Sequence, residues 1–113
     1  EKVSGLYEPF EPSILRLIKM VADASHAQGG FTGMCGEMAG DPQAAPLLIG
    51  LGVQELSMSP VSLLKVKKAV RNVTLKQAQS LAEQALLLES GQEVRALLES
   101  AAQKQRTAGG ENA

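Results

Sequence analysis

The sequence has 113 residues, which is enough for one small domain or for part of a larger one. Its 11 Lys and Arg residues nearly balance its 12 Asp and Glu residues, so the composition favours neither nucleic acid nor an anionic membrane as a partner. No apolar run approaches the roughly 18 residues of a membrane-spanning helix, and the first residues do not resemble a signal peptide.

The first third of the chain predicts an irregular lead-in followed by one helix. Residues 1–10 show no regular apolar period. Pro12 suits the first turn of a helix, and apolar residues recur at helical spacing over residues 14–24. We expect the pair Gly29-Gly30 to end this helix.

Two short segments in the middle of the chain predict strands, and the first of them is apolar. Residues 31–35 follow the glycine pair directly, and we interpret them as a buried strand; residues 54–58 predict a second strand. Between them, Asp41-Pro42 has the pattern of an N-cap with Pro at the first helical position, and Gly50 and Gly52 should end that helix. Strands separated by helices imply parallel pairing with right-handed crossovers.

The rest of the chain predicts helices only. Ser59-Pro60 has the pattern of a cap and first turn for a helix that continues to about Arg71. Two more helices should open with capping boxes, formed by Thr74 with Gln77 and by Ser90 with Glu93. Residues 107–113 are small and polar, and we expect a flexible tail there.

Two predicted strands and about five predicted helices do not make a complete α/β domain. Two parallel strands are too few for a stable sheet, because each strand needs both faces and both edges covered. About five helices accompany them, and their apolar faces need partners that the chain does not supply. An alternating pattern of this kind is typical of a doubly wound sheet or of a (β/α)8 barrel, which takes roughly 250 residues. We therefore expect a slice of a larger domain, and a first residue other than Met fits a processed product or a piece of a longer chain.

The single cysteine, Cys35, is the first candidate for chemistry. It lies at the expected carboxyl end of the first strand, where α/β folds gather functional groups, and glycines flank it at positions 33 and 36. A cysteine thiol is ordinarily protonated at neutral pH and can donate a proton. Judged on position alone, however, a lone cysteine is more often an inert core residue than a catalyst. One cysteine also excludes an internal disulfide, which fits a reducing compartment such as the cytoplasm.

The segment around Cys35 resembles a known signature. Residues 33–42, Gly-Met-Cys-Gly-Glu-Met-Ala-Gly-Asp-Pro, are similar to the motif near the C-terminus of the Enzyme I family of the bacterial sugar phosphotransferase system, the phosphoenolpyruvate–protein phosphotransferases. Four further segments agree in order, namely residues 6–9, 12–19, 47–52 and 55–59. Pyruvate phosphate dikinase and phosphoenolpyruvate synthase share the theme more loosely, and a fragment of such an enzyme is an alternative.

The resemblance implies a fold and a reaction. Residues 1–106 would be the C-terminal part of a phosphoenolpyruvate-binding TIM barrel and would supply its last two strands. The family moves a phosphoryl group from phosphoenolpyruvate to a histidine of the enzyme and then to a carrier protein for sugar uptake. Cys35 corresponds to the family's proton donor, which converts enolpyruvate into pyruvate. The ligands of the family's Mg²⁺, its substrate-binding arginines, and the N-terminal domain with its phosphorylated histidine and carrier contact would all lie upstream, so the chain alone should be inactive.

The remaining polar residues favour structural roles. His26 near a helix C-terminus is most simply a solvated surface residue. Glu37 and Asp41 lack a His or a second Cys at ligand spacing, which disfavours a metal site, and Glu37 has no assignable role. A basic cluster between positions 65 and 76 predicts a solvated helix face, with contact to a carrier protein or nucleic acid as its alternative. It consists of Lys65, Lys67, Lys68, Arg71 and Lys76.

A second hypothesis assigns the chain no catalysis of its own. The family's barrel domain also forms homodimers, so the chain is alternatively a dimerisation or assembly module. Uncovered sheet edges and apolar helix faces would favour self-association in either case.

Overall fold

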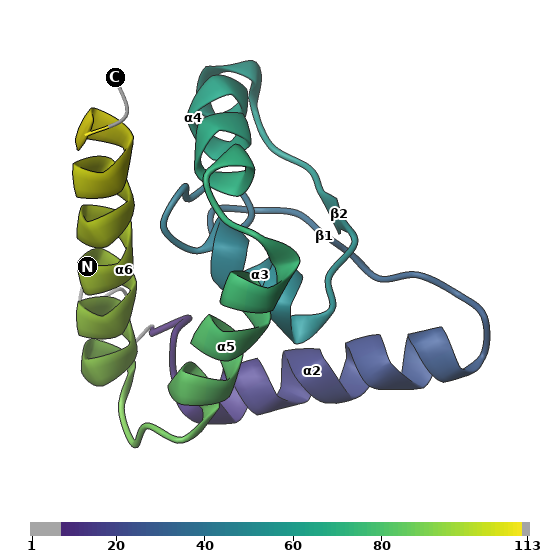
Figure 1. The fold of residues 1–113 in the computed structure, drawn as a ribbon. Helices are drawn as coiled ribbons and strands as arrows, with labels where there is room; N and C mark the ends of the chain where they lie inside the picture. Colours follow the sequence, from purple (N-terminus) through teal and green to yellow (C-terminus); the bar gives the residue numbers. More distant parts are fainter. Residues whose placement is uncertain (1–7, 112–113) are drawn as a thin grey trace, which may run out of the picture.

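A computed structural model describes residues 8–111, with side chains up to residue 108. These residues form five helices and one sheet of two strands (Figure 1). The elements in chain order are α2 (Pro12–Ala27), β1 (Gly33–Met34), α3 (Ala45–Leu51), β2 (Glu55–Leu56), α4 (Pro60–Arg71), α5 (Leu75–Leu86) and α6 (Gly91–Glu111). This is the predicted helix-rich α/β pattern. The predicted lead-in falls largely on residues 1–7, which lie outside the described residues.

The two strands pair in parallel, as predicted. Gly33 lies opposite Glu55 and Met34 opposite Leu56, with α3 between the strands in the chain. The amide of Gln54 donates to the carbonyl of Thr32 at 2.8 Å. The prediction that the first strand is buried is wrong, because Phe31 is 64% exposed and Gly33 is exposed. Both strands are also shorter than predicted, since no described neighbour extends the ladder beyond this pair.

The core lies among α3, α5, the start of α2 and the first half of α6. Its fully buried members are aliphatic, and the largest are Leu15, Leu47, Leu48, Leu51 and Val94. Helix α2 runs across one end of α3 and α5, while α6 stands beside them (Figure 1). Within residues 8–108 no polar or charged residue is fully buried, so the core is packed from apolar side chains.

The close packing of α3 on α5 explains the role of Gly50, which was wrongly predicted to end the helix. Gly50 was expected to end the helix, but α3 continues to Leu51 and ends with Gly52 in the left-handed conformation, with φ of 107°. A Cβ atom at Gly50 would collide with the backbone carbonyl group of Ala78 in α5. Gly50 therefore permits a close helix contact, and Gly52 is the helix terminator.

The start of α3 also differs from the prediction. Residues 42–44 form turns, and the regular helix begins at Ala45. Asp41 caps this turn rather than the helix, because its Oδ1 accepts from the amide of Gln43 at 2.9 Å. Pro46 has no N–H, so the carbonyl of Pro42 lacks the helical partner that would start the helix earlier.

The helix starts read from capping boxes are confirmed. Thr74 Oγ1 accepts from the amide of Gln77 at 3.0 Å, and the Gln77 side chain accepts from the amide of Thr74 at 2.9 Å. The Ser90 and Glu93 pair makes the same reciprocal bonds. Helix α6 ends later than predicted, at Glu111, so residues 107–111 have a helical backbone where a tail was expected. The Thr107 hydroxyl donates to the Gln103 carbonyl there, and the flexibility of this end stays a prediction.

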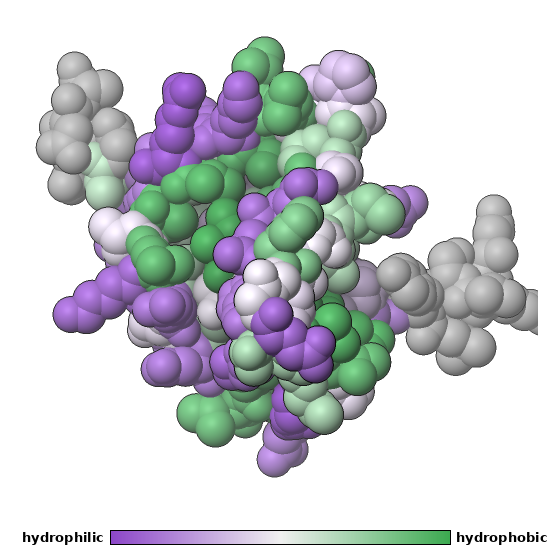
Figure 2. Space-filling model, turned by 90° about the vertical axis from the view of Figure 1, so that its right-hand side faces the viewer, coloured by the Kyte–Doolittle hydropathy of each residue, from purple (hydrophilic) through white to green (hydrophobic). Residues whose placement is uncertain are grey.

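Several helices present apolar side chains to solvent, as expected of a piece of a larger domain. On α2, Leu17 and Met20 are 58% and 66% exposed; on α4, Val61 and Leu64 are 83% and 76% exposed. Figure 2 shows hydrophobic side chains on one face of the molecule among polar ones. None of the helices in the described part is both long and apolar enough to cross a membrane.

Candidate functional site

Cys35 lies at the carboxyl end of the sheet, where the sequence places it. It follows the last residue of β1, and its side chain is exposed. Gly36 comes next with φ of 96°, a left-handed conformation that turns the chain sharply and that favours glycine. The predicted position at the end of the strand is confirmed, but Cys35 is exposed and not part of a buried strand as predicted; its catalytic role stays a prediction.

The end of the second strand lies beside this thiol. The amide of Ser57, which follows β2, donates to the carbonyl of Met34 at 2.9 Å. The residues just after both strands therefore share one edge, on which Cys35 and Ser57 are both exposed. This edge, formed by residues 35–38 and 57–59, is called the thiol edge below.

Backbone hydrogen bonds and packing against the core and α4 hold the loop after Cys35. The amide of Gly40 donates to the carbonyl of Gly36 at 3.3 Å, and that of Asp41 to Met38 at 3.3 Å. Ala39 is fully buried, and Met38 packs partly against the core. A Cβ atom at Gly40 would lie 3.3 Å from the Ser62 hydroxyl oxygen, so the loop fits closely against α4. The thiol thus stands on a short, supported turn.

Glu37 and Asp41 are the acidic residues that follow the thiol in the chain. Glu37 is exposed, and Asp41 already accepts the turn hydrogen bond described above. Among the side chains of residues 8–108, no three His, Cys, Asp or Glu gather closely enough to hold a metal ion.

Neither His26 nor the basic cluster belongs to the thiol edge. His26 lies at the end of α2, and its Nε2 is 3.0 Å from Oε1 of Gln54. All five residues of the basic cluster are exposed, which is compatible with the predicted solvated face and equally with the alternative of a partner contact. Two of them, Lys65 and Lys68, also border a groove that the sequence does not reveal.

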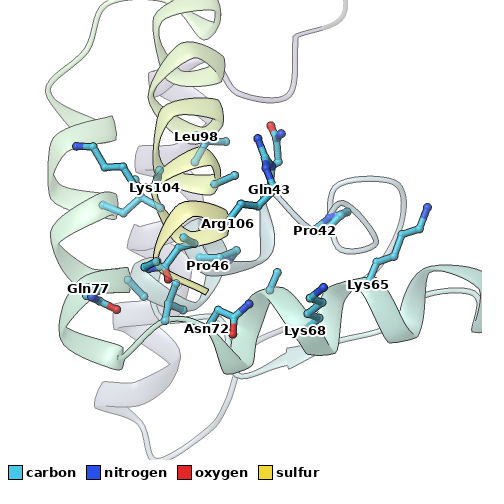
Figure 3. A pocket seen from close by; sticks show the side chains of 18 of the residues that line it. Pro42, Gln43, Pro46, Lys65, Lys68, Asn72, Gln77, Leu98, Lys104 and Arg106 are labelled. Atoms are coloured by element: carbon cyan, nitrogen blue, oxygen red, sulfur yellow. The ribbon is translucent and has the colours of Figure 1, made fainter. Parts of the chain in front are cut away.

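That groove has a volume of about 770 Å³ and lies between α4, α5 and the second half of α6 (Figure 3). No residue of the thiol edge lines it. It is called the α4–α6 groove below. Helical periodicity predicts which face of each helix is apolar, but not the gap that remains when three helices meet.

An ion pair that joins distant parts of the chain was also missed. Arg95 of α6 contacts Glu8 with a nitrogen–oxygen distance of 3.0 Å, and its guanidinium lies 4.7 Å from the centre of the Phe10 ring. Hydrogen bonding from Arg95 lowers the pKa of Glu8 below its ordinary value, with a backbone hydrogen bond from Phe10 adding to the effect and partial burial opposing it. The pair ties the start of the described chain to α6, and no sequence pattern links positions so far apart.

Comparison with known proteins agrees with the resemblance carried by residues 33–42. Over 99 residues, 88% of its length, the chain is 54% identical to the phosphoenolpyruvate-protein phosphotransferase of Listeria monocytogenes. It is 50% identical over the same length to those of Staphylococcus carnosus and Haemophilus influenzae. The chain spans 17% of the length of each of these relatives. A family model described as "PEP-utilising enzyme, PEP-binding domain" matches residues 1–75. The chain therefore belongs to the family of phosphoenolpyruvate (PEP)-utilising enzymes.

Proposed function

We propose that this chain is the C-terminal part of a phosphoenolpyruvate–protein phosphotransferase and that Cys35 protonates enolpyruvate. The observation that carries the proposal is the exposed thiol at the carboxyl edge of a parallel strand pair. In a (β/α)8 barrel this edge is where catalytic residues gather. The two strands would be the last two of the barrel, and the rest would come from outside this chain.

The proposed step follows from the chemistry of the substrate. Cleavage of the bond between phosphorus and the enol oxygen transfers the phosphoryl group to an enzyme histidine and leaves enolpyruvate. Enolpyruvate leaves as the enolate, and the Sγ–H of Cys35 then donates its proton to C3 while the enolate oxygen becomes the ketone oxygen, giving pyruvate and a thiolate. Solvent returns a proton to the thiolate. This is general acid catalysis, for which the donor must reach the reacting carbon.

The surroundings of Cys35 suit such a donor. Gly33, two residues before it, is exposed, and the left-handed Gly36 directs the following chain away. Neither glycine carries a side chain that would block a ligand from the thiol. Burial of Ala39 and partial burial of Met38 hold the turn in place, which would keep the sulfur positioned relative to bound substrate.

The other parts of the reaction do not fit this chain. The family's Mg²⁺ finds no cluster of acidic ligands among the described residues, so its ligands would lie elsewhere in the longer protein. The phosphorylated histidine, the arginines that hold the substrate and the contact with the carrier protein are likewise assigned to the missing part. Sugar uptake, a cytoplasmic location and homodimerisation complete the proposal for the whole protein.

A second candidate function is assembly without catalysis. The exposed apolar residues of α2 and α4 favour it, because such faces mark surfaces that another element covers. Light scattering on the 113-residue chain measures its oligomeric state and thereby tests the assembly role. A monomer with cooperative unfolding would contradict an assembly role for these faces.

The test of the proton-donor role uses Cys35→Ala and Cys35→Ser in the full-length protein. Both variants should still accept the phosphoryl group from PEP, but pyruvate formation should slow by roughly two orders of magnitude or more, the usual contribution of a positioned general acid. Enolpyruvate that leaves unprotonated would acquire its proton in solution. With PEP that carries tritium at one defined C3 position, reaction in deuterated water should then give a C3 methyl group without the facial selectivity expected of the parent enzyme.

The matched control is Ser57→Ala, which changes an exposed polar side chain on the same edge. It should affect pyruvate formation much less than either Cys35 variant. If Cys35→Ala slowed phosphoryl transfer and pyruvate formation equally, the cysteine would not be the proton donor.

A further inference from the structure

The α4–α6 groove combines an apolar floor with an unbalanced charge on its rim. Leu81, Leu98 and Ala101, together with Pro46, are among its apolar lining residues. Lys65 and Lys68 of α4 stand on one wall, and Lys104 and Arg106 of α6 on the other. No Asp or Glu is found among the lining residues of the described chain. This bias is local, because the whole chain carries a formal net charge of −1.

The shape of the groove fits an elongated occupant. Its α6 wall extends over residues 98–108, which at about 1.5 Å per residue corresponds to roughly 15 Å, or about three helical turns. Apolar residues form the floor between the charged walls. Amphipathic helices dock into grooves of this kind through side chains repeated every three or four residues.

The positions of the cations argue against a single small anion. Lys104 and Lys65 lie at opposite sides of the pocket in Figure 3, with Lys68 near the Lys65 side. An occupant with acidic groups along its length suits cations on two separate helices better than one phosphate or carboxylate does. Acidic side chains flanking the apolar face of a helix could meet both walls at once, and such complementarity favours binding and sets orientation.

We propose that the α4–α6 groove binds an acidic amphipathic helix of a partner protein. Its apolar face would lie on Leu81, Ala101 and Ala102, and its Asp or Glu residues would face Lys68 and Arg106 on the two walls. The interaction is independent of Cys35, because no residue of the thiol edge lines the groove. Its failure or success therefore leaves the proton-donor proposal untouched.

The test uses a fluorescein-labelled synthetic peptide that forms a helix of about three turns, with Leu on one face and Glu on both flanks. A matched peptide carries Gln in place of every Glu. Fluorescence anisotropy is measured at low and at high salt with the full-length protein that carries this chain and with the 113-residue chain. The acidic peptide should bind saturably, about tenfold or more tightly than the Gln peptide, and salt should weaken it.

Two double variants locate the binding surface. Lys68→Glu with Arg106→Glu reverses one cation on each wall and should weaken the acidic peptide at least about tenfold. Lys67→Glu with Arg71→Glu makes the same charge change at exposed α4 positions outside the groove, and should leave binding nearly unchanged. Circular dichroism confirms that each variant stays folded.

Three results would overturn the proposal. Equal binding of the acidic and Gln peptides would show that charge plays no part, and equal weakening by both double variants would place the contact outside the groove. Binding by the isolated chain but not by the full-length protein would show that the rest of the protein covers the groove.

Discussion

Gly50→Ala probes the tightest contact of the fold with one added methyl group. A Cβ atom at this position would collide with the carbonyl carbon and oxygen of Ala78 and would lie 3.0 Å from the Cβ of Ala82. The obstacle is the backbone of α5, which cannot turn aside as a flexible side chain could. Helix α3 would therefore have to move away from α5 and loosen the packing of Leu47 and Leu48, both fully buried.

Two opposing terms determine the expected magnitude. Overpacking a well-packed core costs about 1–3 kcal/mol, and contact with backbone places this site near 3 kcal/mol. Replacing Gly by Ala inside a helix returns about 1 kcal/mol of helix propensity. We therefore expect the free energy of unfolding to fall by about 2 kcal/mol.

Urea unfolding of the 113-residue chain, followed by far-UV circular dichroism, measures this change. With a slope of about 2 kcal/mol per molar urea, the midpoint should fall by roughly 1 M. Gly33→Ala is the control, because its Cβ would meet only the Glu55 side chain at an ordinary 3.6 Å, and its midpoint should move little. A stability of Gly50→Ala at or above that of the parent would refute the close α3–α5 contact.

Three further predictions use the same unfolding measurement. Thr74→Ala removes the capping-box oxygen that accepts from Gln77, and should lower the free energy of unfolding by about 1 kcal/mol; no change would mean that solvent replaces the cap. Arg95 lowers the pKa of Glu8 below its ordinary 4.5, so their pair stabilises the fold above that pH and loses its contribution as the pH falls through the lowered value. Glu8→Gln should remove this acid-side loss, an effect below about 1 kcal/mol because Arg95 is half exposed, and an unchanged pH profile would contradict it. Cys35→Ala should change stability by less than about 0.5 kcal/mol, since the thiol is exposed; a larger loss would indicate a packing role.

Features that depend on neighbouring residues could be predicted from the sequence. The capping boxes at Thr74 and Ser90 are local patterns, and both form the expected bonds. The parallel pairing of the strands and the place of Cys35 at the end of the first strand follow from the alternation of strands and helices, whereas the exposure of the thiol was not predicted.

Features that depend on how elements meet in space could not. A glycine at position 50 suggests the end of a helix. Only the close approach of α5 shows that Gly50 instead leaves room for the neighbouring backbone. The α3 start was misplaced because the effect of Pro46 on the residues before it outweighs the cap pattern of Asp41. Lys68 and Arg106 line the same α4–α6 groove from different helices, and no spacing along the chain indicates that they do.

The thiol edge, where we propose the chemistry, is separate from the buried core that stabilises the chain. The buried core joins α3, α5 and the first half of α6, whereas the thiol edge rests on a two-stranded sheet whose described residues are partly exposed. Each of these strands has an outer edge that no described strand pairs, and the apolar residues of α2 and α4 lie uncovered. In a barrel, flanking strands would pair those edges and helices would cover those faces. The buried core thus positions the turn after Cys35 through Met38 and Ala39. The environment that would make Cys35 a proton donor would depend on strands outside this chain.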